Sequence, residues 1–142
     1  MKNSQEILSS VFKTTQLNQT RIRSILDLGM QSSLRQELEA QLEGYHSIEM
    51  DVHTIANQRG WELYELDPTA RFLIDIHARA KICGKNTDSL IAGMIIQRST
   101  REMIRGFKYL HRLDHPDPEI QVISQRLLDQ ETHAIRQMEN FL

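Results

Sequence analysis

The sequence predicts an all-α protein in which four long helices form a bundle and a short fifth helix lies in the connection between the second and third. Apolar residues recur at helical spacing, and no segment alternates apolar and polar residues as a half-buried strand would. The few glycines and prolines fall where this periodicity stops. We therefore expect one helical domain over residues 1–142. Its helices are expected at about 4–28, 34–59, 68–82, 87–113 and 118–141.

The first helix is expected to begin at Ser4. Asn3 followed by Glu6 is typical of a capping box, and Gly29 is a natural C-terminal stop after Leu28. Between these signals the apolar positions fall on one stripe, which predicts a face turned to the core. The stripe contains Leu8, Val11, Phe12, Ile22, Ile25 and Leu26.

The second helix has the same kind of boundaries. Ser33 followed by Gln36 resembles a capping box, and Gly60 ends the helix. Only a short loop separates it from the first helix, so the two should pack antiparallel. Its stripe contains Leu34, Leu38, Leu42, Tyr45, Val52 and Ala56.

The connection over residues 60–86 is long enough to travel the length of a bundle, so the third long helix can run parallel to the second. A short helix in it should be capped by Asp67, with Pro68 at its first position. Its apolar face either covers a second apolar face of the third long helix or leaves that face as a subunit interface. The two faces are Phe72, Leu73 and Ile76, and Leu90, Ile91, Met94 and Ile95.

The third long helix carries a basic stripe opposite an apolar side that includes Ile104 and Phe107. We expect a solvated face whose cations pair with acidic neighbours, with a phosphate-bearing ligand or acidic partner as the alternative. The last helix should begin at Pro118 after Asp117 as its cap. The basic stripe consists of Arg98, Arg101, Arg105, Lys108 and Arg112.

Each apolar stripe is interrupted by polar residues near its middle, at a similar depth in all four long helices. Buried polar groups are costly without partners, so these residues should form a hydrogen-bonded network, a hydrated layer or a ligand site. The expected polar layer comprises Thr15, Asn18, Gln19, His46, Glu49, Gln97, Thr100, Gln130 and Glu131.

The helix order resembles the ferritin-like superfamily, a class of four-helix bundles with one long crossover. The segment from Leu34 to Tyr64, LRQELEAQL…IANQRGWELY, is similar to the spore coat F family and to related small ferritin-like domains. Members of that family have a second helix that starts with a Leu-Arg-rich segment and ends in Arg-Gly-Trp, here Arg59, Gly60 and Trp61.

Ferritin-like oxidases hold two metal ions through a Glu on each of two helices and Glu-x-x-His on the other two. Here Glu43 and His46 match that string, but the helical wheel turns His46 and Glu49 inward instead, and Glu102 away from the seam. Too few carboxylates remain for a two-metal site, so we expect a polar layer without metal and no cofactor. The weak candidates for an iron or manganese site are His46, Glu49, Gln130 and Glu131.

Composition excludes several classes of protein. One cysteine, Cys83, rules out an intrachain disulfide framework, and a net charge of −2 argues against a nucleic-acid binder. No apolar run approaches the ~20 residues of a membrane span, and the first residues lack a signal-peptide pattern, so we expect a cytoplasmic or spore-associated protein.

Two hypotheses for the function follow. The first is a non-enzymatic structural or interaction protein of the ferritin-like superfamily, related to spore coat proteins, with a degenerate metal site. The alternative is an iron- or manganese-binding protein that uses the polar layer. For either hypothesis we expect a twofold homodimer, because isologous pairs are the commonest closed assembly.

Overall fold

The computed structural model describes residues 2–80, 82 and 87–142. In these residues the chain is helical and contains no strand, although Lys2 and Leu113 form an isolated bridge. The predicted all-α class is confirmed. The elements are α1 (Ser4–Ile25), α2 (Ser32–Arg59), α3 (Pro68–Ala80), α4 (Thr87–His111), α5 (Pro118–Met138) and the short 3₁₀ helix η1 (Glu139–Phe141).

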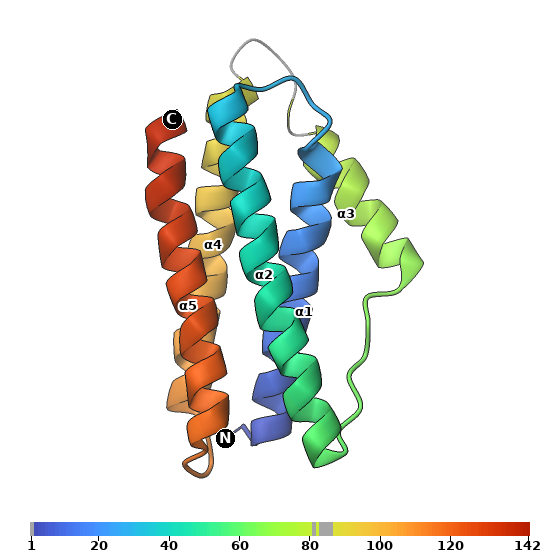
Figure 1. Ribbon diagram of the computed structural model, residues 1–142, viewed down its shortest axis with the longest axis vertical. Coiled ribbons are helices and arrows are strands. Elements are labelled where there is room, and N and C mark those ends of the chain that lie inside the picture. Colours follow the sequence, from blue (N-terminus) through green and yellow to red (C-terminus); the bar gives the residue numbers. More distant parts are fainter. Residues whose placement is uncertain (1, 81, 83–86) are drawn as a thin grey trace.

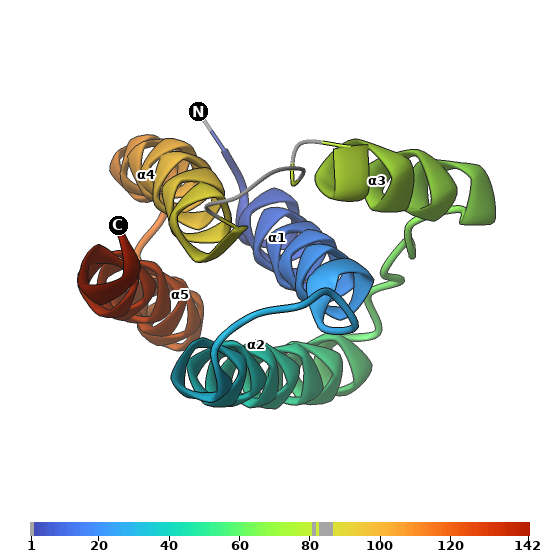
Figure 2. The same cartoon turned by 90° about the horizontal axis from the view of Figure 1, so that it is seen from above.

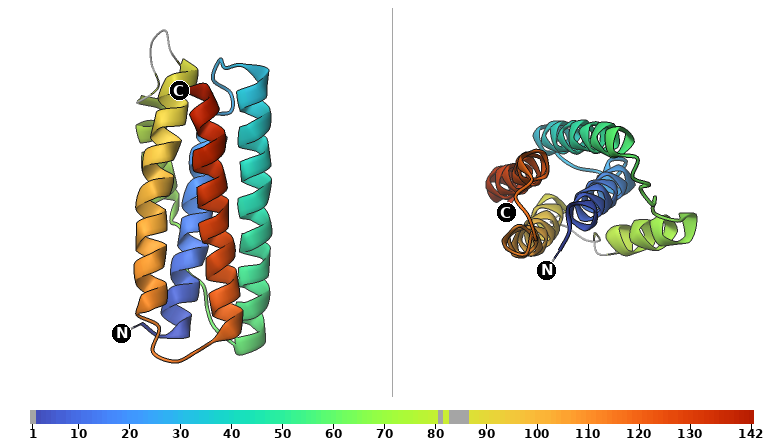
Figure 3. Two further views of the ribbon diagram at one scale, coloured as in Figure 1. Left: turned by 90° about the vertical axis from the view of Figure 1, so that its left-hand side faces the viewer. Right: turned by 90° about the horizontal axis from the view of Figure 1, so that it is seen from below.

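The four long helices form a bundle of two antiparallel pairs, α1 with α2 and α4 with α5 (Figure 1, Figure 2). The pairs meet mainly through α5, which contacts both α2 and α1, whereas α1 and α4 make few contacts. Figure 3 shows that α2 and α4 run in the same direction, because the chain between them returns along the bundle through α3. The largest fully buried side chains include Phe12, Leu38, Tyr45, Ile91 and Met138.

Several helix ends follow from local sequence signals. The Asn3 side chain accepts a hydrogen bond from the Glu6 amide at 2.9 Å, so the predicted cap of α1 is confirmed. Gly60 closes α2 with a φ of 67°, a conformation that favours glycine. At α3, the Asp67 carboxylate accepts from the Ala70 amide at 2.7 Å, as predicted.

Two other helix ends differ from the prediction. Helix α1 ends at Ile25, and Gly29 is not its stop. The guanidinium of Arg35 donates to the carbonyls of Leu26 and Leu28, which supplies partners to the end of α1 from the next helix. Helix α2 begins at Ser32 without a side-chain cap, so the predicted Ser33 cap is wrong.

Helix α3 packs almost entirely on α1. The Leu66 amide donates to Gln16 Oε1 at 3.0 Å before the helix, and Arg79 donates to the Ser24 carbonyl at 2.9 Å near its end. These two anchors fasten α3 to α1, with Ala78 buried on the inner side. The apolar face of α3 does not cover α4. Phe72, Leu73 and Ile76 are 62%, 60% and 48% exposed.

Candidate functional site

A pair of polar contacts bridges α1 and α4 at mid-bundle. Arg21 Nη1 lies 2.8 Å from Glu102 Oε1, and Asn18 Nδ2 donates to Glu102 Oε2 at 2.7 Å. The Glu102 side chain is only 8% exposed, so the expectation that it points away from the seam is wrong. Helical periodicity missed it because its partners come from another helix, and an acidic residue carries no apolar signal.

Glu131 of α5 lies at the centre of the bundle and is 1% exposed. Glu102 and Ser99 are its polar neighbours, yet neither Glu131 oxygen completes a hydrogen bond with the described residues. Burial, and then the negative charge of Glu102, raises the pKa of Glu131 far above its ordinary value. The buried Tyr45 faces the same group, and burial followed by the charge of Glu131 raises its pKa as well. This layer therefore disfavours additional negative charge.

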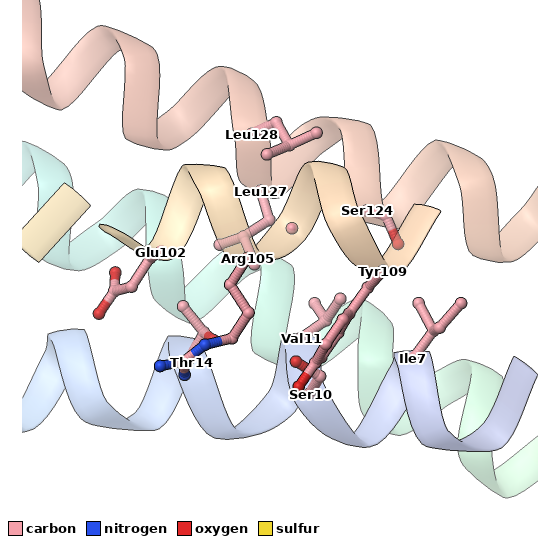
Figure 4. Close-up of a pocket in the computed structure, with 11 residues that line it drawn as sticks. Ile7, Ser10, Val11, Thr14, Glu102, Arg105, Tyr109, Ser124, Leu127 and Leu128 are labelled. Atoms are coloured by element: carbon pink, nitrogen blue, oxygen red, sulfur yellow. The ribbon is translucent and has the colours of Figure 1, made fainter. Parts of the chain in front are cut away.

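The cavities beside Glu102 and Tyr45 are small. Figure 4 shows Glu102, Arg105 and Tyr109 of α4 reaching toward α1 around one of them. That cavity has a volume of about 20 Å³, and a second of about 20 Å³ lies beside Tyr45 and Gln41. Each has room for about one water molecule, whereas organic ligands occupy pockets of roughly 300 Å³ or more.

A second polar cluster lies in the seam between α1 and α2. Gln19 Nε2 donates to Glu49 Oε2, and His53 Nε2 lies 3.7 Å from Glu49 Oε1. Arg23 donates to Gln19 Oε1 at 3.2 Å, and the His53 ring meets the Phe12 ring edge-on. The structure thus places Gln19 and Glu49 together in the α1–α2 seam. The polar neighbours of Glu131 come from α4 instead, so these residues do not form one layer.

His46 and Glu49 were both predicted to point inward, and for His46 this prediction is wrong. His46 is exposed, because Tyr45 and Ile48 occupy the inward positions of that turn. Gln97 of α4 is exposed as well, so it does not belong to a buried layer.

The remaining predicted polar residues form local contacts. The hydroxyl of buried Thr15 donates to the Phe12 carbonyl, and that of Thr100 donates to the Ile96 carbonyl, each at 2.7 Å. Gln130 lies in the α2–α5 seam, where Nε2 donates to the Gln41 carbonyl at 3.3 Å. A Cβ at Gly44 would lie 2.5 Å from Gln130 Oε1, so glycine leaves the space that this amide fills.

The side of α4 that faces the core was predicted incorrectly, because several large apolar residues of this helix are exposed. Ile104 and Phe107, expected to face inward, are 50% and 45% exposed. The signal that identifies the correct side is small residues at every seventh position: Ala92, Ser99 and Gly106. They let α4 approach α5 closely, and a Cβ at Gly106 would lie 2.9 Å from Leu128 Cδ2. The site residues that sequence reasoning missed are Arg21, Ser99 and Glu102, whereas Tyr45 was expected in the core but not as a neighbour of a buried carboxyl group.

Most of the basic stripe on α4 is exposed, as expected of a solvated face, but the expected pairing with acidic neighbours is not found among the described residues. Within the described residues none of its members forms an ion pair, whereas Arg21, Arg59, Arg79 and Arg126 all do. The pKa of Arg98 is lowered by burial and by the charges of Arg21 and Arg101. The stripe is therefore a row of cations without direct ion-pair partners among the described residues, and the charge of Glu102 only partly offsets that of Arg98.

The described part of the chain contains no group of three or more His, Cys, Asp or Glu side chains positioned to hold a metal ion. No helix there is both long and apolar enough to cross a membrane. Cys83 lies outside the described residues. Comparison of the chain with family models, curated proteins and solved structures finds no match.

Proposed function

We propose that the protein is a non-enzymatic structural or interaction protein with a degenerate metal site. The observation that carries this proposal is the Arg21–Glu102 pair. The Arg21 guanidinium neutralises one of the two central carboxylates, a charge that a metal ion would otherwise balance. The other carboxyl, Glu131, is held uncharged by its raised pKa. Cavities of about 20 Å³ leave no room for an organic substrate in this layer.

The proposal includes membership of the ferritin-like superfamily and relationship to spore coat proteins, with the chain acting in the cytoplasm or on the spore. Two observations support it. The parallel course of α2 and α4, joined through a long crossover, is the arrangement of that superfamily. The residues of the spore coat F resemblance also have structural roles: Arg35 caps α1, Gly60 ends α2, and Arg59 lies 5.0 Å over the Trp61 ring.

The interaction surfaces that we propose lie on α4. The basic stripe offers an acidic protein partner five cations that form no ion pair with the described residues. Near the start of α4, Leu90 is 42% exposed and is the centre of the proposed twofold homodimer contact. Ile91 is completely buried and cannot contribute to it, although the sequence placed it on the same face.

Metal loading tests the proposal against the metal-binding alternative. Untagged protein is incubated anaerobically with Fe(II), or with Mn(II), then desalted and subjected to elemental analysis. We expect far less than one metal ion per chain, because the site supplies its own cation. The matched variant is Glu102→Gln, which removes the carboxylate that faces Arg21.

Stoichiometric metal in the unaltered protein that disappears in Glu102→Gln would overturn the proposal and establish the metal-binding alternative. Equal retention by both proteins would place the metal at exposed side chains such as His46, outside the mid-bundle layer.

A further inference from the structure

An open groove of about 600 Å³ lies between α3 and α4, with α1 at its floor. Its walls are mainly apolar, and its volume is in the range of small-molecule sites, roughly 300–1,000 Å³. Among the described residues the groove is open, because the apolar face of α3 makes at most weak contact with α4. The apolar lining consists of Leu73, Ile74, Ile76 and Ala78 from α3 and Met94 from α4.

The same groove carries concentrated positive charge. Arg21 and Arg98 line it together, with His77 from α3. Arg21 shares its charge with Glu102, but half-buried Arg98 has no hydrogen bond or ion pair with any described residue. Burial and the nearby charges of Arg21 and Arg101 lower the pKa of Arg98, and the charge of Glu102, already paired with Arg21, offsets this only in part. An anion beside Arg98 would relieve this repulsion.

We propose that this groove binds an amphipathic carboxylate, such as a straight-chain fatty acid. The carboxylate pairs with Arg98 beside Arg21, and the alkyl chain lies against Leu73, Ile76 and Met94. A planar guanidinium binds a carboxylate through two parallel hydrogen bonds, which makes arginine suited to this head group. The alkyl chain would then cover the exposed apolar side chains of α3 that line the groove, Leu73 and Ile76. The inference goes beyond the proposed function: it shares Arg21 with the mid-bundle pair and Arg98 with the basic stripe, but it does not depend on whether the mid-bundle layer binds metal.

The head-group test uses isothermal titration calorimetry with decanoate, below the concentration at which it forms micelles. The full chain should bind decanoate saturably, with one molecule per chain. Arg98→Gln should weaken binding by about tenfold, the loss expected for one charged hydrogen-bonding partner. Arg105→Gln is the matched control, because it removes a cation from the same helix outside the groove and should leave the affinity unchanged.

The tail test compares two neighbouring exposed side chains of α3. Leu73→Ser removes an apolar group from the groove and should weaken decanoate binding, whereas Phe72→Ser, which does not line the groove, should not. Both residues are more than half exposed, so both variants should keep the helicity and melting temperature of the parent protein.

Three results would overturn the inference. If acetate binds as tightly as decanoate, the groove holds only a free anion. If 1-decanol binds as tightly as decanoate, the arginines play no part. If light scattering shows that Leu73→Ser abolishes self-association while decanoate fails to bind, the occupant is a second copy of the chain. Metal loading of the unaltered protein has no bearing on these outcomes, so failure here is distinguishable from failure of the proposed function.

Discussion

Glu131 links a single buried carboxyl group to the pH dependence of stability. The unfolded chain releases this proton near the ordinary glutamate pKa, about 4.3, whereas the folded protein retains it because burial raises the pKa. The folded state therefore binds more protons above that pH. The contribution of this group to stability is fully present below about pH 4 and is lost as the pH rises toward the folded pKa.

Replacement of Glu131 by Gln should remove this proton requirement while keeping the side-chain shape. We expect the free energy of unfolding to increase by about 1–3 kcal/mol near pH 8, and to change little near pH 4. Urea unfolding followed by circular dichroism at several pH values measures this difference. Glu43→Gln, at an exposed position of α2, serves as the control and should change stability at neither pH. Equal destabilisation by Glu131→Gln at both pH values would contradict an uncharged Glu131.

At the scale of the helices, Asp117 joins three elements at one end of the bundle. Its carboxylate accepts from the Ile120 amide at the start of α5, from the Ser4 hydroxyl of α1 at 2.7 Å, and from Arg59 Nη1 of α2 at 2.6 Å. The Arg59 guanidinium lowers the pKa of Asp117 well below its ordinary range. The carboxylate thus stabilises the fold at pH values above about 4, and this contribution is lost as the pH falls.

Asp117→Ala should lower the free energy of unfolding by about 2 kcal/mol at neutral pH, because it removes both the helix cap and the ion pair. Asp117→Asn keeps a good capping side chain and should lose less than about 1 kcal/mol. Chemical unfolding of the two variants side by side measures the difference. If they lose equal amounts, the ion pair rather than the cap dominates.

A feature could be predicted from the sequence when the interaction that determines it joins residues close together in the chain. Asn3, Asp67 and Asp117 cap helices through residues three positions away, so the sequence identifies them. The end of α1 depends on Arg35 of the next helix. In the same way, buried Glu131 was a candidate by periodicity, but its neighbour Glu102 is drawn inward by Arg21, a contact across the bundle that one helix does not reveal.

At the scale of the whole molecule, the proposed homodimer depends on apolar surface that the chain leaves uncovered. Light scattering at micromolar concentration should show twice the 16.6 kDa chain mass. Leu90→Lys should convert the protein to monomer, because it places a charge at the centre of the proposed twofold contact.

The matched control is Val122→Lys, which changes an exposed apolar residue of α5 away from that contact. It should leave the dimer intact. A monomeric mass for the unaltered protein would remove the homodimer from the proposal and leave Leu90 as ordinary surface.

Within the described residues α3 is attached almost entirely to α1, and this has a consequence for how the molecule opens. A helix held mainly by one neighbour can detach without disturbing the contacts between α2 and α5 or between α4 and α5. Amide protons of α3 should therefore exchange with solvent through a local opening of low free energy, whereas those of α2 and α5 should exchange only when the whole bundle unfolds. The four long helices and α3 would then be two cooperative units, and α3 would unfold at a lower denaturant concentration than the bundle.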